Sequence, residues 1–139
     1  MKRYLLITPW CPYPPHKNGG VHTIYNMIKN IPKDIEMDLL YYYEKDDIAE
    51  KVVSQYINSI AYINLRKAKS LFSRINTFLK QFPDYFSEFN FRNNIDCIEY
   101  VKYDVIILDQ IISLPFLDNI PVKSKVIVMM HDNNVLLYQ

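Results

Sequence analysis

Apolar runs of strand length alternate with stretches of helical pattern along the whole chain. The clearest apolar runs occupy residues 3–8, 103–108 and 125–130. A strand that is apolar at nearly every position must be covered on both faces, and strands separated by helices pair in parallel. The alternation therefore predicts an α/β fold, a Rossmann-like doubly wound parallel sheet of about five strands with helices on both faces.

The shorter segments between these runs fit the same alternation. A helix is predicted directly after residue 20, because apolar residues recur there at helical spacing and Pro32 stops the pattern. The other predicted elements are strands at residues 35–42 and 59–64, helices at 48–56, 65–82 and 85–101, and a short element at 114–117.

Length and composition limit the class of protein. The chain has 139 residues, half of them hydrophobic, and a net charge of +1, which favours one globular domain and disfavours a nucleic-acid-binding protein. Cys11 and Cys97 form no CxxC pair, so a reduced cytoplasmic protein that needs no metal or cofactor is expected. No apolar stretch approaches the roughly 20 residues of a spanning helix.

The only two glycines, Gly19 and Gly20, are adjacent and lie between the first predicted strand and the first predicted helix. Without a Cβ, and with free amide groups at a helix start, such a pair lets a phosphate approach closely. Alternatively, Asn18 and Gly19 form a simple turn, with Gly20 near the helix N-cap. Neither GxGxxG nor GxxxxGK[ST] occurs, which argues against a standard dinucleotide fold or a Walker-type nucleotide triphosphatase.

Polar residues follow the fourth and fifth predicted strands. His131 comes directly after the fifth strand, where an imidazole can donate to a hydroxyl or phosphate and exchange a proton near neutral pH. Asp132 and Asn133 follow it and could line the site or cap a helix. Asp109 follows the fourth strand, where it either binds a ligand or faces solvent as an ordinary polar strand end.

Taken together, these features resemble the N-terminal domain of family-4 glycosyltransferases of the GT-B fold. The similarity covers the basic start, first strand and proline-rich loop of residues 1–15, the Gly19-Gly20 pair with its helix, the strand that begins Tyr103-Asp104-Val105, and the strand that ends in His131-Asp132-Asn133. Their order and spacing match over essentially the entire chain.

The resemblance implies a retaining, metal-independent transfer of a sugar from a nucleotide-diphosphate donor to a saccharide or lipid-linked acceptor, as in polysaccharide or glycoconjugate synthesis. It would place Gly19 and Gly20 against the donor diphosphate or acceptor and His131 at the catalytic centre. Asp109, Asp132 and Asn133 would line the same cleft. Residues 1–139 would form the single acceptor-side domain, with the donor-binding C-terminal domain missing, so we expect no transferase activity from this chain alone.

The sequence leaves two alternatives open. Arg66, Lys67 and Lys69 begin a basic helix, which is either a solvated face or a peripheral contact with anionic lipid at the inner membrane face. The alternative to an enzyme half is a non-catalytic nucleotide- or sugar-binding module with the same α/β fold. A phosphorylation-type receiver domain is disfavoured, because Thr8-Pro9-Trp10 follows the first strand where such a domain needs acidic residues.

Overall fold

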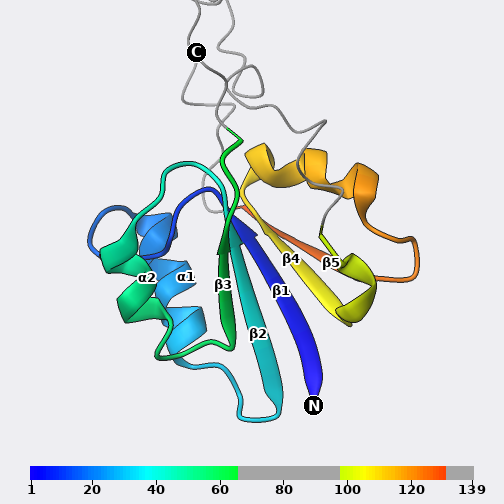
Figure 1. Cartoon of the computed structure of the whole chain (residues 1–139), viewed down its shortest axis with the longest axis horizontal. Coiled ribbons are helices and arrows are strands. Elements are labelled where there is room, and N and C mark those ends of the chain that lie inside the picture. The colour runs from blue at the N-terminus through cyan, green and yellow to red at the C-terminus, as the bar shows by residue number, and fades with distance from the viewer. Residues whose placement is uncertain (66–97, 131–139) are drawn as a thin grey trace, which may run out of the picture.

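A single five-stranded sheet forms the centre of the molecule (Figure 1). The computed structural model describes residues 1–65 and 98–130. The strands are β1 (Lys2–Thr8), β2 (Ile35–Tyr41), β3 (Ser59–Tyr62), β4 (Val105–Asp109) and β5 (Lys125–Met129). They lie in the order β3-β2-β1-β4-β5, and every neighbouring pair is parallel. The predicted Rossmann-like parallel sheet is confirmed.

The connections run in opposite directions from the centre of the sheet. Helix α1 (Gly19–Lys29) joins β1 to β2 and helix α2 (Asp47–Val53) joins β2 to β3, moving toward one edge. On the other side of β1, the 3-10 helix η2 (Tyr100–Lys102) precedes β4 and the 3-10 helix η3 (Ile111–Asn119) joins β4 to β5. The direction of winding therefore reverses between β1 and β4, which is where open α/β sheets bind ligands.

Both faces of the sheet are covered, as the apolar strand runs predict. One core joins Leu6 and Leu39 of the strands to Ile24 of α1 and Val53 of α2. The opposite core joins Ile7 and Ile106 to Tyr100 of η2 and Phe116 of η3. Alternate strand residues thus enter opposite cores, and each fully buried Leu or Ile contributes roughly 1.5–3 kcal/mol of hydrophobic stabilisation.

Most of the predicted element limits agree with the structure to within a few residues. The helix predicted after residue 20 begins at Gly19, because Asn18 accepts a hydrogen bond from the Val21 amide and caps it. The strand predicted from residue 103 begins at Val105, since η2 occupies the preceding residues and Tyr103 caps it. The element predicted at 114–117 is the 3-10 helix η3. The helices predicted at 65–82 and 85–101 lie almost entirely outside the described residues.

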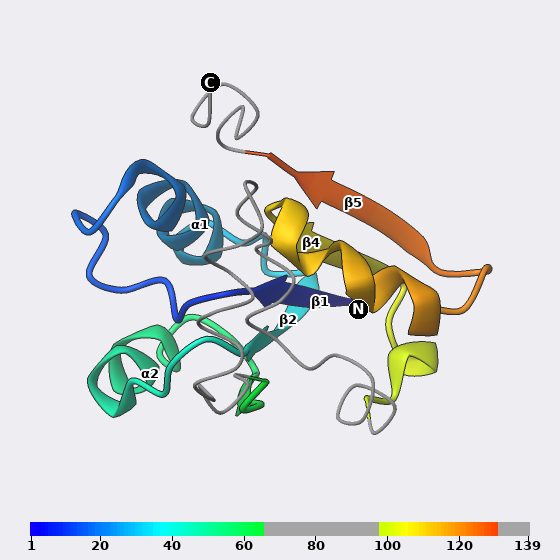
Figure 2. The same ribbon diagram turned by 90° about the horizontal axis from the view of Figure 1, so that it is seen from above.

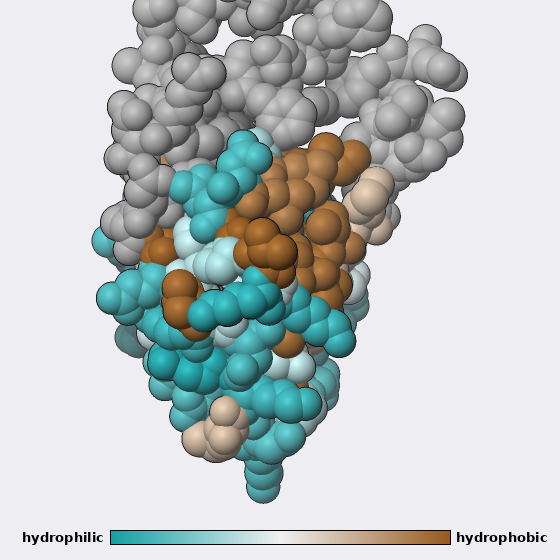
Figure 3. Space-filling view, turned by 90° about the vertical axis from the view of Figure 1, so that its right-hand side faces the viewer, coloured by the Kyte–Doolittle hydropathy of each residue, from teal (hydrophilic) through white to brown (hydrophobic). Residues whose placement is uncertain are grey.

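Strand β5 differs from the other strands in its exposure. Ile127 and Val128 are 42% and 41% exposed although they point to opposite faces. Figure 3 shows apolar surface gathered on this side of the molecule. Leu117 of η3 and Val122, which precedes β5 in the sequence, are exposed as well. The edge strand is therefore the least covered part of the described sheet.

A polar cluster fastens β1, β2 and β4 at the amino edge of the sheet. Asp38 is buried and accepts hydrogen bonds from the Tyr103 hydroxyl and the Asn58 side-chain amide, each at 2.8 Å. Burial alone would raise the pKa of Asp38, but the hydrogen bonds from Asn58, Ser59 and Tyr103 bring it below its ordinary value. The Arg3 guanidinium lies 3.7 Å from the same carboxylate. This edge is occupied by structural contacts.

We predict that Tyr103→Phe lowers the free energy of unfolding by about 1–2 kcal/mol at neutral pH, because a buried carboxylate oxygen loses its donor. Urea denaturation measures the loss. The matched control is Tyr4→Phe, a half-buried tyrosine whose hydroxyl makes no hydrogen bond within residues 1–65 and 98–130, and it should change stability little.

The same cluster predicts a pH dependence. The folded-state pKa of Asp38 is lowered, so its contribution is present above the unfolded pKa of about 4 and is lost as the pH falls through the folded value. The stability difference between the native chain and Tyr103→Phe should therefore shrink on acidification below that range. A difference that stays constant or grows would contradict the assignment.

Candidate functional site

The carboxyl ends of β1 and β4 meet at the point where the winding reverses. The Thr8 hydroxyl donates to Asp109 Oδ2 over 2.8 Å, and both side chains are almost fully buried. Because both residues end their strands, this hydrogen bond joins β1 to β4 at the point where the direction of winding reverses, which we call the switch point. Figure 2 looks down on this edge, with α1 and η3 on either side of β1.

A second hydrogen-bonded chain continues from Asp109 into the opposite core. The Ser113 hydroxyl donates to the Asp109 carbonyl oxygen at 2.6 Å and lies 2.9 Å from the Tyr42 hydroxyl. Burial raises the pKa of Tyr42, so this phenol stays neutral. The network links β4, the start of η3 and the end of β2, and it fixes the backbone that leaves the switch point.

Gln110, the next residue, holds a strained backbone conformation. Its φ of 67° and ψ of 157° lie in a region that residues other than glycine rarely adopt. Its amide donates to the Met129 carbonyl at 2.8 Å, which carries the chain across to the end of β5. Strain of this kind persists only where surrounding contacts enforce it, and it is concentrated at binding sites and active sites.

The glycine pair lies at the same edge, in the first turn of α1. Neither glycine has a positive φ, and a Cβ built on Gly19 would meet no atom within 4 Å. The fold itself therefore does not require a glycine at position 19. Asn18 is the N-cap residue, which agrees with the alternative in which Gly20 lies near the helix N-cap. Asn18 takes the Val21 amide, and no described residue accepts a hydrogen bond from the amides of Gly19 or Gly20. These two donors point out of the helix start.

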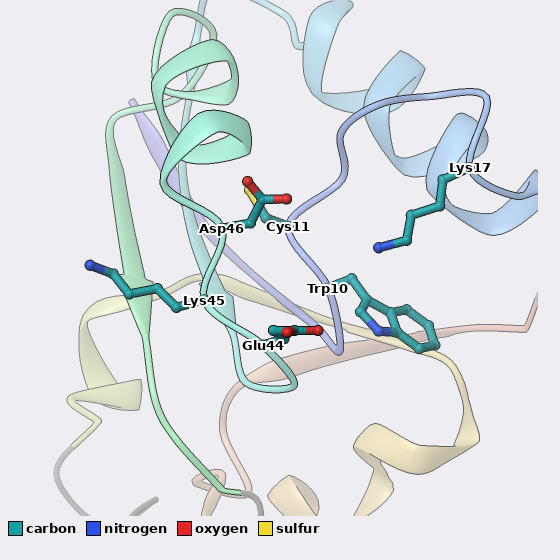
Figure 4. A pocket seen from close by; sticks show the side chains of 6 residues that line it. All are labelled: Trp10, Cys11, Lys17, Glu44, Lys45 and Asp46. Atoms are coloured by element: carbon teal, nitrogen blue, oxygen red, sulfur yellow. The ribbon is translucent and has the colours of Figure 1, made fainter.

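A small pocket opens between the loops that follow β1 and β2 (Figure 4). Its volume is about 170 Å³, and its lining residues are Trp10, Cys11, Lys17, Glu44, Lys45 and Asp46. The Lys17 ammonium and the Glu44 carboxylate face the central space near the Trp10 ring, whereas the Lys45 ammonium points away and pairs with Asp47 at 2.8 Å. The pocket carries equal numbers of basic and acidic groups.

Backbone hydrogen bonds and an aromatic contact hold together the two loops that form this pocket. The Pro9 carbonyl accepts hydrogen bonds from the amides of Tyr42 and Tyr43, at 3.3 and 2.8 Å, and so joins the two loops. The Trp10 ring packs against Tyr43 with centroids 5.5 Å apart. The pocket is therefore formed before any ligand arrives.

Cys11 contributes a buried thiol to the base of the pocket. Burial, with the nearby charges of Asp46 and Glu50, raises the pKa of Cys11 to about 12. The thiol is neutral at physiological pH and cannot act as a nucleophile there. The Asp46 carboxylate is already engaged in a structural hydrogen bond, because its Oδ1 accepts from the Ala49 amide and caps α2. Glu44 and Lys17 are left as the charged groups available to a ligand.

No protein-family model matches the chain, and no curated protein or solved structure matches it significantly. Within the described ranges, no helix is long and apolar enough to cross a membrane. The same residues include no group of three or more His, Cys, Asp or Glu that could hold a metal ion.

The structure places the residues predicted from sequence as follows. Gly19, Gly20 and Asp109 lie at the carboxyl edge, but Asp109 is buried and hydrogen-bonded, so its description as a solvent-facing strand end is wrong. His131, Asp132 and Asn133 lie outside the described residues, as do Arg66, Lys67 and Lys69. The pocket was not predicted, although the single tryptophan after the first strand and the acidic residues after the second could have indicated it.

We predict that Gln110→Gly raises the free energy of unfolding by about 1 kcal/mol, because glycine adopts this φ without steric strain. Chemical denaturation gives the value. Gln55→Gly, in the turn that follows α2, is the control and should not stabilise the chain. Equal effects of the two substitutions would show that Gln110 stores no strain.

Proposed function

We propose that this chain is the acceptor-side, Rossmann-like domain of a retaining glycosyltransferase that uses a nucleotide-diphosphate sugar. The proposal rests most directly on one observation: open space and amides without an acceptor among the described residues occur at Gly19, where α1 begins at the carboxyl edge of the sheet. The resemblance in order and spacing to family-4 glycosyltransferases supports it further. The active enzyme would require a second, donor-binding domain.

The chemistry of sugar transfer fits the features of this edge. The leaving group is a nucleotide diphosphate, and amide dipoles at a helix start stabilise the negative charge that develops on it. A glycine at that position permits contact between the phosphate and the backbone. His131, two residues after the end of β5 in the sequence, is proposed to act on the transferred sugar or the acceptor hydroxyl.

The experiment is a titration of the chain with UDP-glucose, GDP-mannose and ADP-glucose, followed by tryptophan fluorescence. Trp10 is the only tryptophan and lies in the loop that precedes the glycine pair, so its emission reports on this edge alone. We expect weak, saturable binding of at least one nucleotide sugar. An unchanged spectrum with all three would contradict the proposal.

Gly19→Ala separates a binding role of the glycine from a structural one. We predict that the variant is more stable by about 0.4–1 kcal/mol, because alanine fits the helical turn and restricts the unfolded chain. It should bind the nucleotide sugar about tenfold more weakly, since the new methyl group blocks phosphate approach. Thermal denaturation and the fluorescence titration measure the two effects.

Lys29→Ala, at an exposed position in the last turn of α1, is the control and should leave binding unchanged. Full affinity in Gly19→Ala would refute phosphate contact at this turn. We expect the purified chain to transfer no sugar by itself. Saturable binding without transfer, even when a donor-binding domain is supplied, would favour a non-catalytic sugar- or nucleotide-binding module.

A further inference from the structure

The pocket between the β1–α1 and β2–α2 loops is separate from the glycine pair. None of Gly19, Gly20 or Asp109 lines it. Its volume of about 170 Å³ is well below the roughly 300–1,000 Å³ of sites that hold a whole cofactor or nucleotide. A single small ring with its substituents is the appropriate size of ligand.

The charges of the pocket argue against an ionic ligand. Lys17 and Lys45 are balanced by Glu44 and Asp46. A phosphate site would carry an excess of positive charge or a set of converging amides, and a cation site would carry an excess of carboxylates. A ligand without net charge that both donates and accepts hydrogen bonds fits best.

The two available charged groups supply complementary hydrogen bonds. The Glu44 carboxylate accepts only, and the Lys17 ammonium donates only. Neither group forms an ion pair within residues 1–65 and 98–130. Adjacent hydroxyls of a sugar can donate to the first and accept from the second, which is a pairing that an apolar ring cannot make.

The aromatic side of the pocket fits a sugar ring. Trp10 is half-buried, and its ring packs against the ring of Tyr43 at an angle of 45°. The C–H-rich face of a pyranose packs well on a flat indole, while its hydroxyls point outward to polar partners. Because Pro9 pins both loops together, little ordering is needed on binding.

We propose that this pocket binds one neutral pyranose unit, stacked on Trp10 and hydrogen-bonded to Glu44 and Lys17. The inference deepens the proposed function, on which it rests, by giving the saccharide its own subsite, distinct from the phosphate contact at Gly19. A zwitterionic amino acid is the competing ligand, with its ammonium on Glu44 and its carboxylate on Lys17.

The test follows the single indole N–H resonance of ¹⁵N-labelled chain during titration with methyl β-D-glucopyranoside, methyl β-D-galactopyranoside and L-serine. Only Trp10 gives this signal. At least one glycoside should shift the resonance saturably, and the affinity should change little with salt because the ligand is uncharged. A shift with L-serine alone, or with none of the three, would overturn the proposal.

Glu44→Ala should weaken glycoside binding about tenfold, because the hydroxyl loses a charged acceptor. Glu36→Ala is the control and should bind normally, because this half-buried glutamate of β2 lies near the amino edge, where its carboxylate is 3.8 Å from Arg3. Normal affinity in Glu44→Ala would overturn the assignment of that residue.

Gly19→Ala keeps the two proposals distinguishable. It should retain full glycoside affinity while losing affinity for the nucleotide sugar. Glycoside binding without any nucleotide-sugar binding would defeat the transferase proposal and leave the pyranose site standing; the reverse result would defeat only the pyranose site.

Discussion

The adjacency of β1 and β4, secured by the hydrogen bond from Thr8 to Asp109, is the constraint on which the rest of this edge depends. Two parallel strands whose following connections diverge are not bridged by a single helix, so the loops that follow them separate above their carboxyl ends. The Thr8–Asp109 hydrogen bond joins the carboxyl ends of the two strands. It leaves the loops after β1 and after β4 to determine what can bind above it.

Each of these loops is held by contacts that originate in the sheet. Gln110 takes its strained conformation between the buried Asp109 and the carbonyl of Met129. The loop after β1 is anchored by the Pro9 carbonyl, and its tryptophan is supported by Tyr43. Rigid support of this kind reduces the conformational entropy that a ligand loses on binding, which is what the proposed saccharide site requires. The amino edge, by contrast, satisfies its charged groups internally through Asp38.

The fold was predictable because its signals are local and repeated. Strand runs such as residues 3–8 are apolar at nearly every position, which only a sheet covered on both faces can satisfy. The position of the switch point was harder to predict from the sequence. It depends on the strand order, and the strand order depends on pairing between residues about 100 positions apart, such as Tyr4 and Val105. No local pattern encodes that choice.

The site was predictable only in part, for a physical reason. Gly19 and Gly20 were recognisable because the chain has no other glycine. The burial of Asp109 was not, because it depends on the distant Thr8. The pocket depends on Trp10 and Glu44 being brought together by the pairing of β1 with β2 and by the Pro9 hydrogen bonds. In the sequence, neither Trp10 nor Glu44 alone differs from an ordinary loop residue.

Mapping backbone amide chemical shifts on addition of a nucleotide sugar tests the central claim, that ligands bind at the carboxyl edge, most directly. We predict that the amides of the non-proline residues within 8–20, and those of Asp109 and Gln110, shift saturably. The amides around Asp34 and Asp104 at the amino edge should not shift. Shifts centred on the amino edge would contradict it.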